Sequence, residues 1–180
     1  MYTTPRDRIA KWVEQGFWGD KTLCDHLALQ VEARPHQLAV IDQTNRGEFA
    51  AGNTLRLTYA ELDATSDAMA LDFIDRGLCH GQRVMVQMPN VVELVICYFA
   101  LSKLGVVASP LPVQYQTHEI ANLSNVFGTE WFIGFSDFKG TNLASHGSVA
   151  VAPDRIITVG TDIRMRSPSG LNGAEAARLA

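Results

Sequence analysis

The segment from Gly81 to Pro112 constrains the fold of this chain more than any other part of the sequence. It begins with a short run rich in β-branched residues, Arg83 to Met88, which has the length of a buried strand. A helical pattern follows from residue 91 to 104, and residues 106 to 110 begin a second strand. A surface helix has one apolar stripe, whereas this helix is apolar on nearly every side and needs cover all round. The segment therefore predicts a strand–helix–strand unit inside a parallel α/β body.

The ends of this central helix carry residues that suit them. Pro89 breaks the strand, Asn90 is a good N-cap, and Glu93 is placed to reach back to the backbone N–H of that cap. At the other end, Lys103 suits the negative end of the helix dipole and Gly105 suits the position just past the last turn. We expect all of them to be structural, together with Pro110 in the second strand.

A second local signal lies in the segment LTYAEL, residues 57 to 62. Thr58 is the predicted N-cap, and Glu61 completes a capping box. Leu57 and Leu62 flank the cap as a hydrophobic staple, and Tyr59 begins the buried face of the helix. The other face, which we predict to be solvated, carries Asp63, Asp67 and Asp72. We expect the helix to end at Gly77.

We predict the remaining helices and strands from the spacing of apolar residues and from the glycines and prolines that interrupt it. Helices are predicted at 6–15, from the cap Thr22 to a stop at Arg34-Pro35, and at 117–127. Strands are predicted at 39–42, 55–57, 131–134 and 155–159. The first two strands form an antiparallel hairpin with a long loop, while the later strand and helix order predicts a parallel sheet with right-handed crossovers. Residues 137–152 fit no single class. We divide the chain into an α/β subdomain, 1–163, and a loose C-terminal tail, 164–180.

Composition excludes several classes of function. The chain has 180 residues, a net charge of −4 and a pI near 5.7, which argue against a nucleic-acid surface. No apolar run is long enough to span a membrane, and residues 1–15 do not have the pattern of a signal peptide. Three cysteines without paired spacing favour a reducing compartment, so we expect a cytoplasmic protein.

Motifs that carry catalysis are missing from the sequence. Neither GxGxxG nor GxxxxGK[ST] occurs, and the glycines stand singly at predicted helix ends. Residues 77–81, GLCHG, match the sequence pattern of a nucleophile elbow, with Cys79 as the nucleophile. Here, however, the predicted helix precedes the strand, which is the reverse of the order that an elbow needs. The histidines have no metal-ligand spacing. We therefore assign no catalytic, cofactor-binding or metal-binding residue.

Two segments together resemble the N-terminal region of AMP-forming acyl-adenylating enzymes, which include acyl- and aryl-CoA ligases. They are LTYAEL (57–62) and VQMPNVVELVICYFALSKLGVVASPLP (86–112). The segment GFWGDKTLCDHL (16–27) is similar to the branch that activates aromatic acids, such as 2,3-dihydroxybenzoate–AMP ligases. The resemblance implies the N-terminal part of a large α/β domain: a parallel sheet with flanking helices and a small antiparallel hairpin.

The resemblance also implies a reaction for a full-length parent. A carboxylate and ATP give an acyl-adenylate and pyrophosphate, with Mg²⁺, and a thioester to CoA or another thiol usually follows. The Ser/Thr/Gly-rich phosphate loop of that family has no counterpart in this sequence, so we expect this chain alone to be inactive and to hold no cofactor. A free-standing interaction module built on the same scaffold and a flavodoxin-like small-molecule binder are the alternatives. We further expect self-association through an exposed apolar face, because one side of the central helix would meet a second sheet in such a parent.

Overall fold

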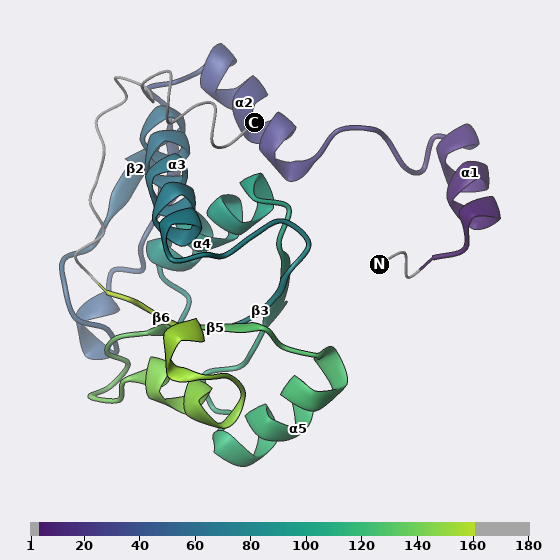
Figure 1. Ribbon diagram of the computed structural model, residues 1–180. Helices are drawn as coiled ribbons and strands as arrows, with labels where there is room; N and C mark the ends of the chain where they lie inside the picture. The colour runs from purple at the N-terminus through teal and green to yellow at the C-terminus, as the bar shows by residue number, and fades with distance from the viewer. Residues whose placement is uncertain (1–3, 161–180) are drawn as a thin grey trace.

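The computed structural model describes residues 4–160 and has a four-stranded parallel sheet at its centre (Figure 1). The strand order is β4-β3-β5-β6, with these bounds: β3 (Arg83–Gln87), β4 (Val107–Pro110), β5 (Trp131–Phe135) and β6 (Ile156–Val159). Every neighbouring pair is parallel, and Val84 lies opposite Ala108 on one side and Trp131 on the other. The predicted α/β class and parallel sheet are confirmed.

Helices cover both faces of this sheet. Helices α3 (Tyr59–Asp75) and α4 (Val92–Lys103) lie on one face, and α5 (Thr117–Phe127) lies on the other with the 3₁₀ helix η2 (Leu143–Val149) (Figure 1). The alternation of side chains along β3 fits this arrangement: Val84 and Val86 belong to the core under α3 and α4, and Met85 packs with Ile120 of α5. A further 3₁₀ helix, η3 (Pro153–Arg155), leads into β6.

The N-terminal third adds a hairpin and two helices. Strands β1 (Leu38–Ile41) and β2 (Arg56–Thr58) pair antiparallel, as predicted, and η1 (Arg46–Glu48) lies in the loop between them. Helix α2 (Leu23–Ala33) begins at the predicted cap Thr22 and packs against α3 and α4. Helix α1 (Arg6–Glu14) has no buried residue and stands away from the rest of the molecule (Figure 1).

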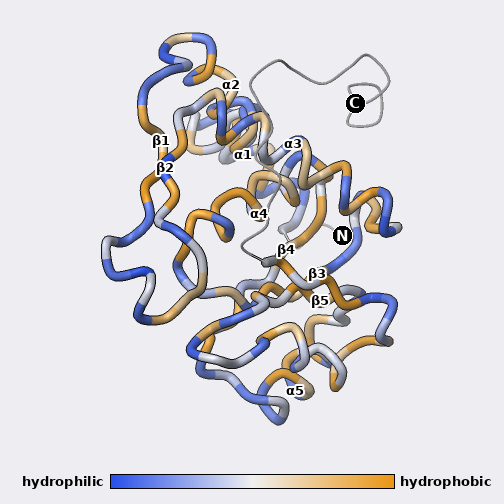
Figure 2. Tube along the Cα trace, turned by 90° about the vertical axis from the view of Figure 1, so that its left-hand side faces the viewer, coloured by the Kyte–Doolittle hydropathy of each residue, from blue (hydrophilic) through white to orange (hydrophobic). Residues whose placement is uncertain are grey.

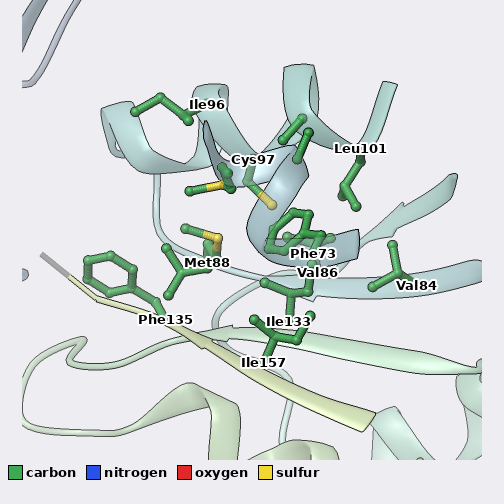
Figure 3. Close-up of a cluster of buried hydrophobic side chains, with 14 of the residues drawn as sticks. Phe73, Val84, Val86, Met88, Ile96, Cys97, Leu101, Ile133, Phe135 and Ile157 are labelled. Carbon is green, nitrogen blue, oxygen red and sulfur yellow. The ribbon is translucent and has the colours of Figure 1, made fainter. Parts of the chain in front are cut away.

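The main core lies between α3, α4 and the sheet. Figure 3 shows Phe73 of α3 and Cys97 of α4 facing Val86 and Ile133 of the central strands, with Ile157 beside them. Every side chain from residue 91 to 104 is buried or half-buried, which is the cover that this apolar helix needs. The hydropathy of the trace agrees, because the sheet and α4 are mostly hydrophobic whereas the outer loops are hydrophilic (Figure 2).

The region 137–152, which the sequence left open, packs closely on β5. A Cβ on Gly134 would lie 2.3 Å from the backbone N and Cα of Ala144, and one on Gly147 would lie 2.7 Å from the ring of Phe132. These two glycines therefore permit close packing of η2 on the strand, which corrects the expectation that all the glycines serve helix ends. The predicted boundary at 163 and the tail 164–180 lie outside the described residues.

Candidate functional site

The topology points to the carboxyl ends of β3 and β5 as the place where a ligand would bind. β4 follows β3 on one side, and the chain then crosses back to place β5 on the other side. In open parallel sheets the crevice at such a switch point is the usual binding site. The residues that close β3 and β5 on this edge are Gln87 and Phe135.

Gln87 ties this edge to the neighbouring connections. Its Nε2 donates to the carbonyl oxygens of Pro112, at 3.1 Å, and Tyr115, at 2.8 Å. Its Oε1 lies 2.9 Å from Nδ1 of His146, which is buried on η2. Because the amide nitrogen is committed to two carbonyls, Oε1 is the acceptor and Nδ1 of His146 carries the hydrogen. The side chain of Gln87 thus links β3 to η2 and to the β4–α5 connection at this edge.

A buried ion network lies on the same side, where β3 leads into α4. Arg46 is 1% exposed and donates to the Asp42 carboxylate at 2.5 Å and to both oxygens of Glu93, at 2.5 and 2.8 Å. Its remaining bonds go to the carbonyl oxygen of Ala51. The hydrogen bonds to Glu93, followed by those to Asp42, raise the pKa of the guanidinium despite its burial. The network fixes the β1–β2 loop against the start of α4.

Asp42 also occupies the N-terminus of α4. Its Oδ1 accepts from the backbone N–H of Val92 at 2.8 Å, and its Oδ2 accepts from that of Leu55 at 2.8 Å. A helix N-terminus attracts anions, and here a carboxylate of the chain holds that position. The predicted cap was wrong: the N-cap is Val91, Asn90 is exposed, and Glu93 reaches Arg46 instead of closing a capping box.

The tip of residues 137–141 covers the outer side of that loop. Phe138 forms a bridge with Ala50, its ring lies 6.3 Å from that of Phe49, and the backbone N–H of Lys139 donates to the carbonyl of Phe49. The loop from 42 to 51 is therefore held between α4 and the β5–η2 connection.

The LTYAEL segment forms the predicted cap. Thr58 Oγ1 accepts from the backbone N–H of Glu61 at 3.3 Å, and Glu61 Oε2 accepts from that of Thr58 at 2.8 Å. Leu57 and Leu62 are buried beside the cap. Tyr59 is half-buried, with the guanidinium of Arg34 5.5 Å from its ring centroid. The capping box predicted for this segment is therefore formed.

Lys103 lies in the last turn of α4, as predicted, and it also links α4 to α3. Its ammonium contacts the carboxylates of Asp63, at 2.7 Å, and Asp67, which joins α4 to α3. These two acids therefore do not lie on a solvated face, and burial raises the pKa of Asp67 although Lys103 opposes that shift.

The remaining family-motif positions follow α4, follow β3 or end β4. Gly105 has a φ of +63° just past the end of α4, which confirms its predicted place. Pro89 is buried, and Pro110 ends β4 in register with Val86.

Within residues 4–160, no three His, Cys, Asp or Glu residues lie together as metal ligands. Burial raises the pKa of the Cys97 thiol to about 12, which keeps it protonated and unreactive. Cys79 is exposed, with Sγ 3.4 Å from the Gly77 carbonyl oxygen. It lies between α3 and β3, as the reversed order of helix and strand predicted.

No helix in the described part of the chain meets the length and apolarity that a membrane span requires.

Comparison with known proteins gives the relatives of this chain. The model of the family described as AMP-binding enzyme matches residues 27–174. Enterobactin synthase component E of Escherichia coli is 31% identical over 155 residues, which cover 82% of this chain and 27% of that protein. The medium-chain fatty-acid–CoA ligase of the same organism is 30% identical over 139 residues, covering 77% and 23%.

Solved structures agree with the fold. The apo structure of Mycobacterium smegmatis MbtA has a TM-score of 0.62 and 27% identity, and the match covers 75% of this chain and 24% of that chain. The chain thus spans about a quarter of the length of these relatives.

Proposed function

The chain belongs to the AMP-binding enzyme family, the AMP-forming acyl and aryl acid ligases, and on that premise we propose that it is the N-terminal part of an ATP-dependent carboxylic acid ligase. The complete enzyme would join a carboxylate to the α-phosphate of ATP, releasing pyrophosphate, and then transfer the acyl group to a thiol. The family match over residues 27–174 is the observation that carries this proposal.

The part of the chain between residues 4 and 160 does not fit the ATP and Mg²⁺ that such a reaction needs. It has no cluster of metal-ligating side chains, and the N-terminus of α4 is already bonded to Asp42. The whole sequence also lacks a glycine-rich phosphate loop. We therefore assign this part to the scaffold, and we expect the 180-residue chain alone to form no adenylate.

The substrate that we favour is an aromatic acid. Salicyl-AMP ligase of Mycobacterium tuberculosis and the vibriobactin-specific 2,3-dihydroxybenzoate–AMP ligase of Vibrio cholerae are 33% and 30% identical over about 100 residues. The segment GFWGDKTLCDHL at 16–27 supports the same branch. An aliphatic acid is the competing class, since a fatty-acid ligase has similar identity.

ATP–pyrophosphate exchange tests both parts of the proposal. The chain and the protein encoded by its uninterrupted reading frame are each incubated with ATP, Mg²⁺, labelled pyrophosphate and a panel of aryl and alkyl acids. We expect exchange only from the longer protein and chiefly with hydroxylated aryl acids.

Three results would contradict this reading. Exchange by the 180-residue chain above a no-protein control would show that the active site is here. A longer protein without exchange on any acid would overturn the ligase assignment. A reading frame that stops after Ala180 would favour the alternative, a non-catalytic interaction module on the same scaffold.

A further inference from the structure

Helix α1 presents an apolar face that nothing in the described part of the chain buries. Ile9 and Trp12 are only half-buried, and Val13 is 53% exposed. Beyond the helix, Trp18 packs on Trp12 with ring centroids 4.8 Å apart, and Phe17 is 75% exposed. Figure 1 shows α1 standing away from the sheet and its covering helices. An amphipathic helix in this position is suited to contact another molecule.

The charges of α1 are arranged around that face. At about 100° per residue, Arg6 and Arg8 border the apolar stripe on its two sides. Asp7 and Glu14 fall on the opposite side of the helix. The contact face of α1 is therefore apolar with a basic border.

A groove of about 400 Å³ on α2 has the complementary character. Its lining combines two small or aliphatic side chains with three acids and one lysine: Ala28, Leu29, Asp20, Asp25, Glu32 and Lys21. Leu29 is 40% exposed. The backbone hydrogen bond from Thr22 lowers the pKa of Asp25, which keeps its carboxylate charged. The groove therefore has a small apolar part, Ala28 and Leu29, and a charged border in which the three acids outnumber the one lysine.

We propose that α1 of one chain docks in the α2 groove of a second copy, so that two chains exchange their N-terminal helices about a twofold axis. The apolar stripe of α1 meets Ala28 and Leu29, and its basic border meets the net negative border of the groove, twice in each dimer. Exchange of an identical element is a low-cost route to a dimer because each chain both gives and accepts the same helix.

The groove itself indicates that the helix comes from another chain. Two of its lining residues, Asp20 and Lys21, belong to the connection between α1 and α2. With Trp18 packed on Trp12, only residues 19–22 remain to make that connection. For α1 to fold back into its own groove, these residues would have to turn and the lining that they provide would be lost.

Paired charge reversals test the proposal by light scattering after size exclusion. Wild-type chain at micromolar concentration is expected to be a dimer. Arg8→Glu places an acid against the net negative border of the groove, and Glu32→Arg places a base against the basic border of α1, so each variant alone should raise the dissociation constant about tenfold or more. An equimolar mixture of the two should restore dimers, because each contact in a heterodimer then has opposite charges at positions 8 and 32.

Reversals away from the contact provide the controls. Glu14→Arg changes the far side of α1, and Arg56→Glu changes the exposed surface of β2, so both variants should dimerise like wild type. A wild-type chain that is monomeric at about 100 µM overturns the proposal. Dimers that survive both single reversals, or variants that fail to recombine when mixed, overturn it as well, since either result places the contact elsewhere.

Discussion

Replacing Arg46 by methionine should be among the most destabilising single changes in this chain. The substitution removes three charge-assisted hydrogen bonds, one to Asp42 and two to Glu93, from a site that is 1% exposed. At about 1.5 kcal/mol for each bond, the loss in unfolding free energy is about 4–5 kcal/mol. Loss of one partner from a buried ion pair gives a similar figure, about 3–5 kcal/mol, because the carboxylates remain buried without their counterion.

Urea denaturation followed by far-UV circular dichroism and by the fluorescence of the buried Trp131 measures this loss. Because 4–5 kcal/mol is a large part of the stability of a domain, the milder change Glu93→Gln, with an expected loss of about 1–3 kcal/mol, provides a second measurement. The double variant Arg46→Met/Glu93→Leu should be more stable than Arg46→Met, since it removes one stranded carboxylate. An Arg46→Met chain within about 1 kcal/mol of wild type would refute the reasoning.

Four smaller effects follow from the other contacts. Thr58→Ala should lower the unfolding free energy by about 1 kcal/mol and Thr58→Ser by much less; equal, large losses would mean that the position does more than cap α3. Asn90→Ala should leave the urea midpoint unchanged, because the side chain makes no cap bond, and a loss of about 1 kcal/mol would restore the cap that the sequence suggested. Lys139→Gly should stabilise by about 1 kcal/mol in the same assay, since Lys139 has a φ of +52° in a two-residue turn; destabilisation would contradict that strain. At pH 8, a thiol reagent should modify Cys79 in the native chain and Cys97 only after unfolding, because the raised pKa keeps the buried thiol neutral; early labelling of Cys97 would show that the core opens.

Local signals predicted most of the fold. Short stretches of sequence determine the cap at Thr58 and the helix end at Gly105, because the residues involved lie within a few positions of one another. Local patterns also define each strand and helix of the strand–helix–strand unit. The same is true of the bounds of α5, which the structure reproduces at Thr117 and Phe127.

Long-range polar partners could not be predicted in this way. Arg46 lies in a polar loop that resembles any solvated loop, and only the folded chain brings it to Glu93, 47 residues later. Because Asp42 arrives at the start of α4 from the hairpin, the local preference of Asn90 for the cap is overridden. Likewise, Asp63 and Asp67 form ion pairs with Lys103, whereas their helical spacing predicted a solvated face. The hydrogen bond between Gln87 and His146 joins residues 59 positions apart, and no spacing rule reports it.

The buried pair between Arg46 and Glu93 also sets an order of events during synthesis. A ribosome adds about 5–20 residues per second, so Glu93 follows Arg46 by about 2–10 s. Throughout that interval the nascent β1–β2 loop carries a guanidinium that has Asp42 but not yet Glu93 as a partner, and burying it early would be costly. The loop should therefore stay hydrated until α4 emerges, which delays packing of the hairpin against the sheet. Until then, a charged side chain lies near the first apolar strands, whose pairing partners have not yet been synthesised.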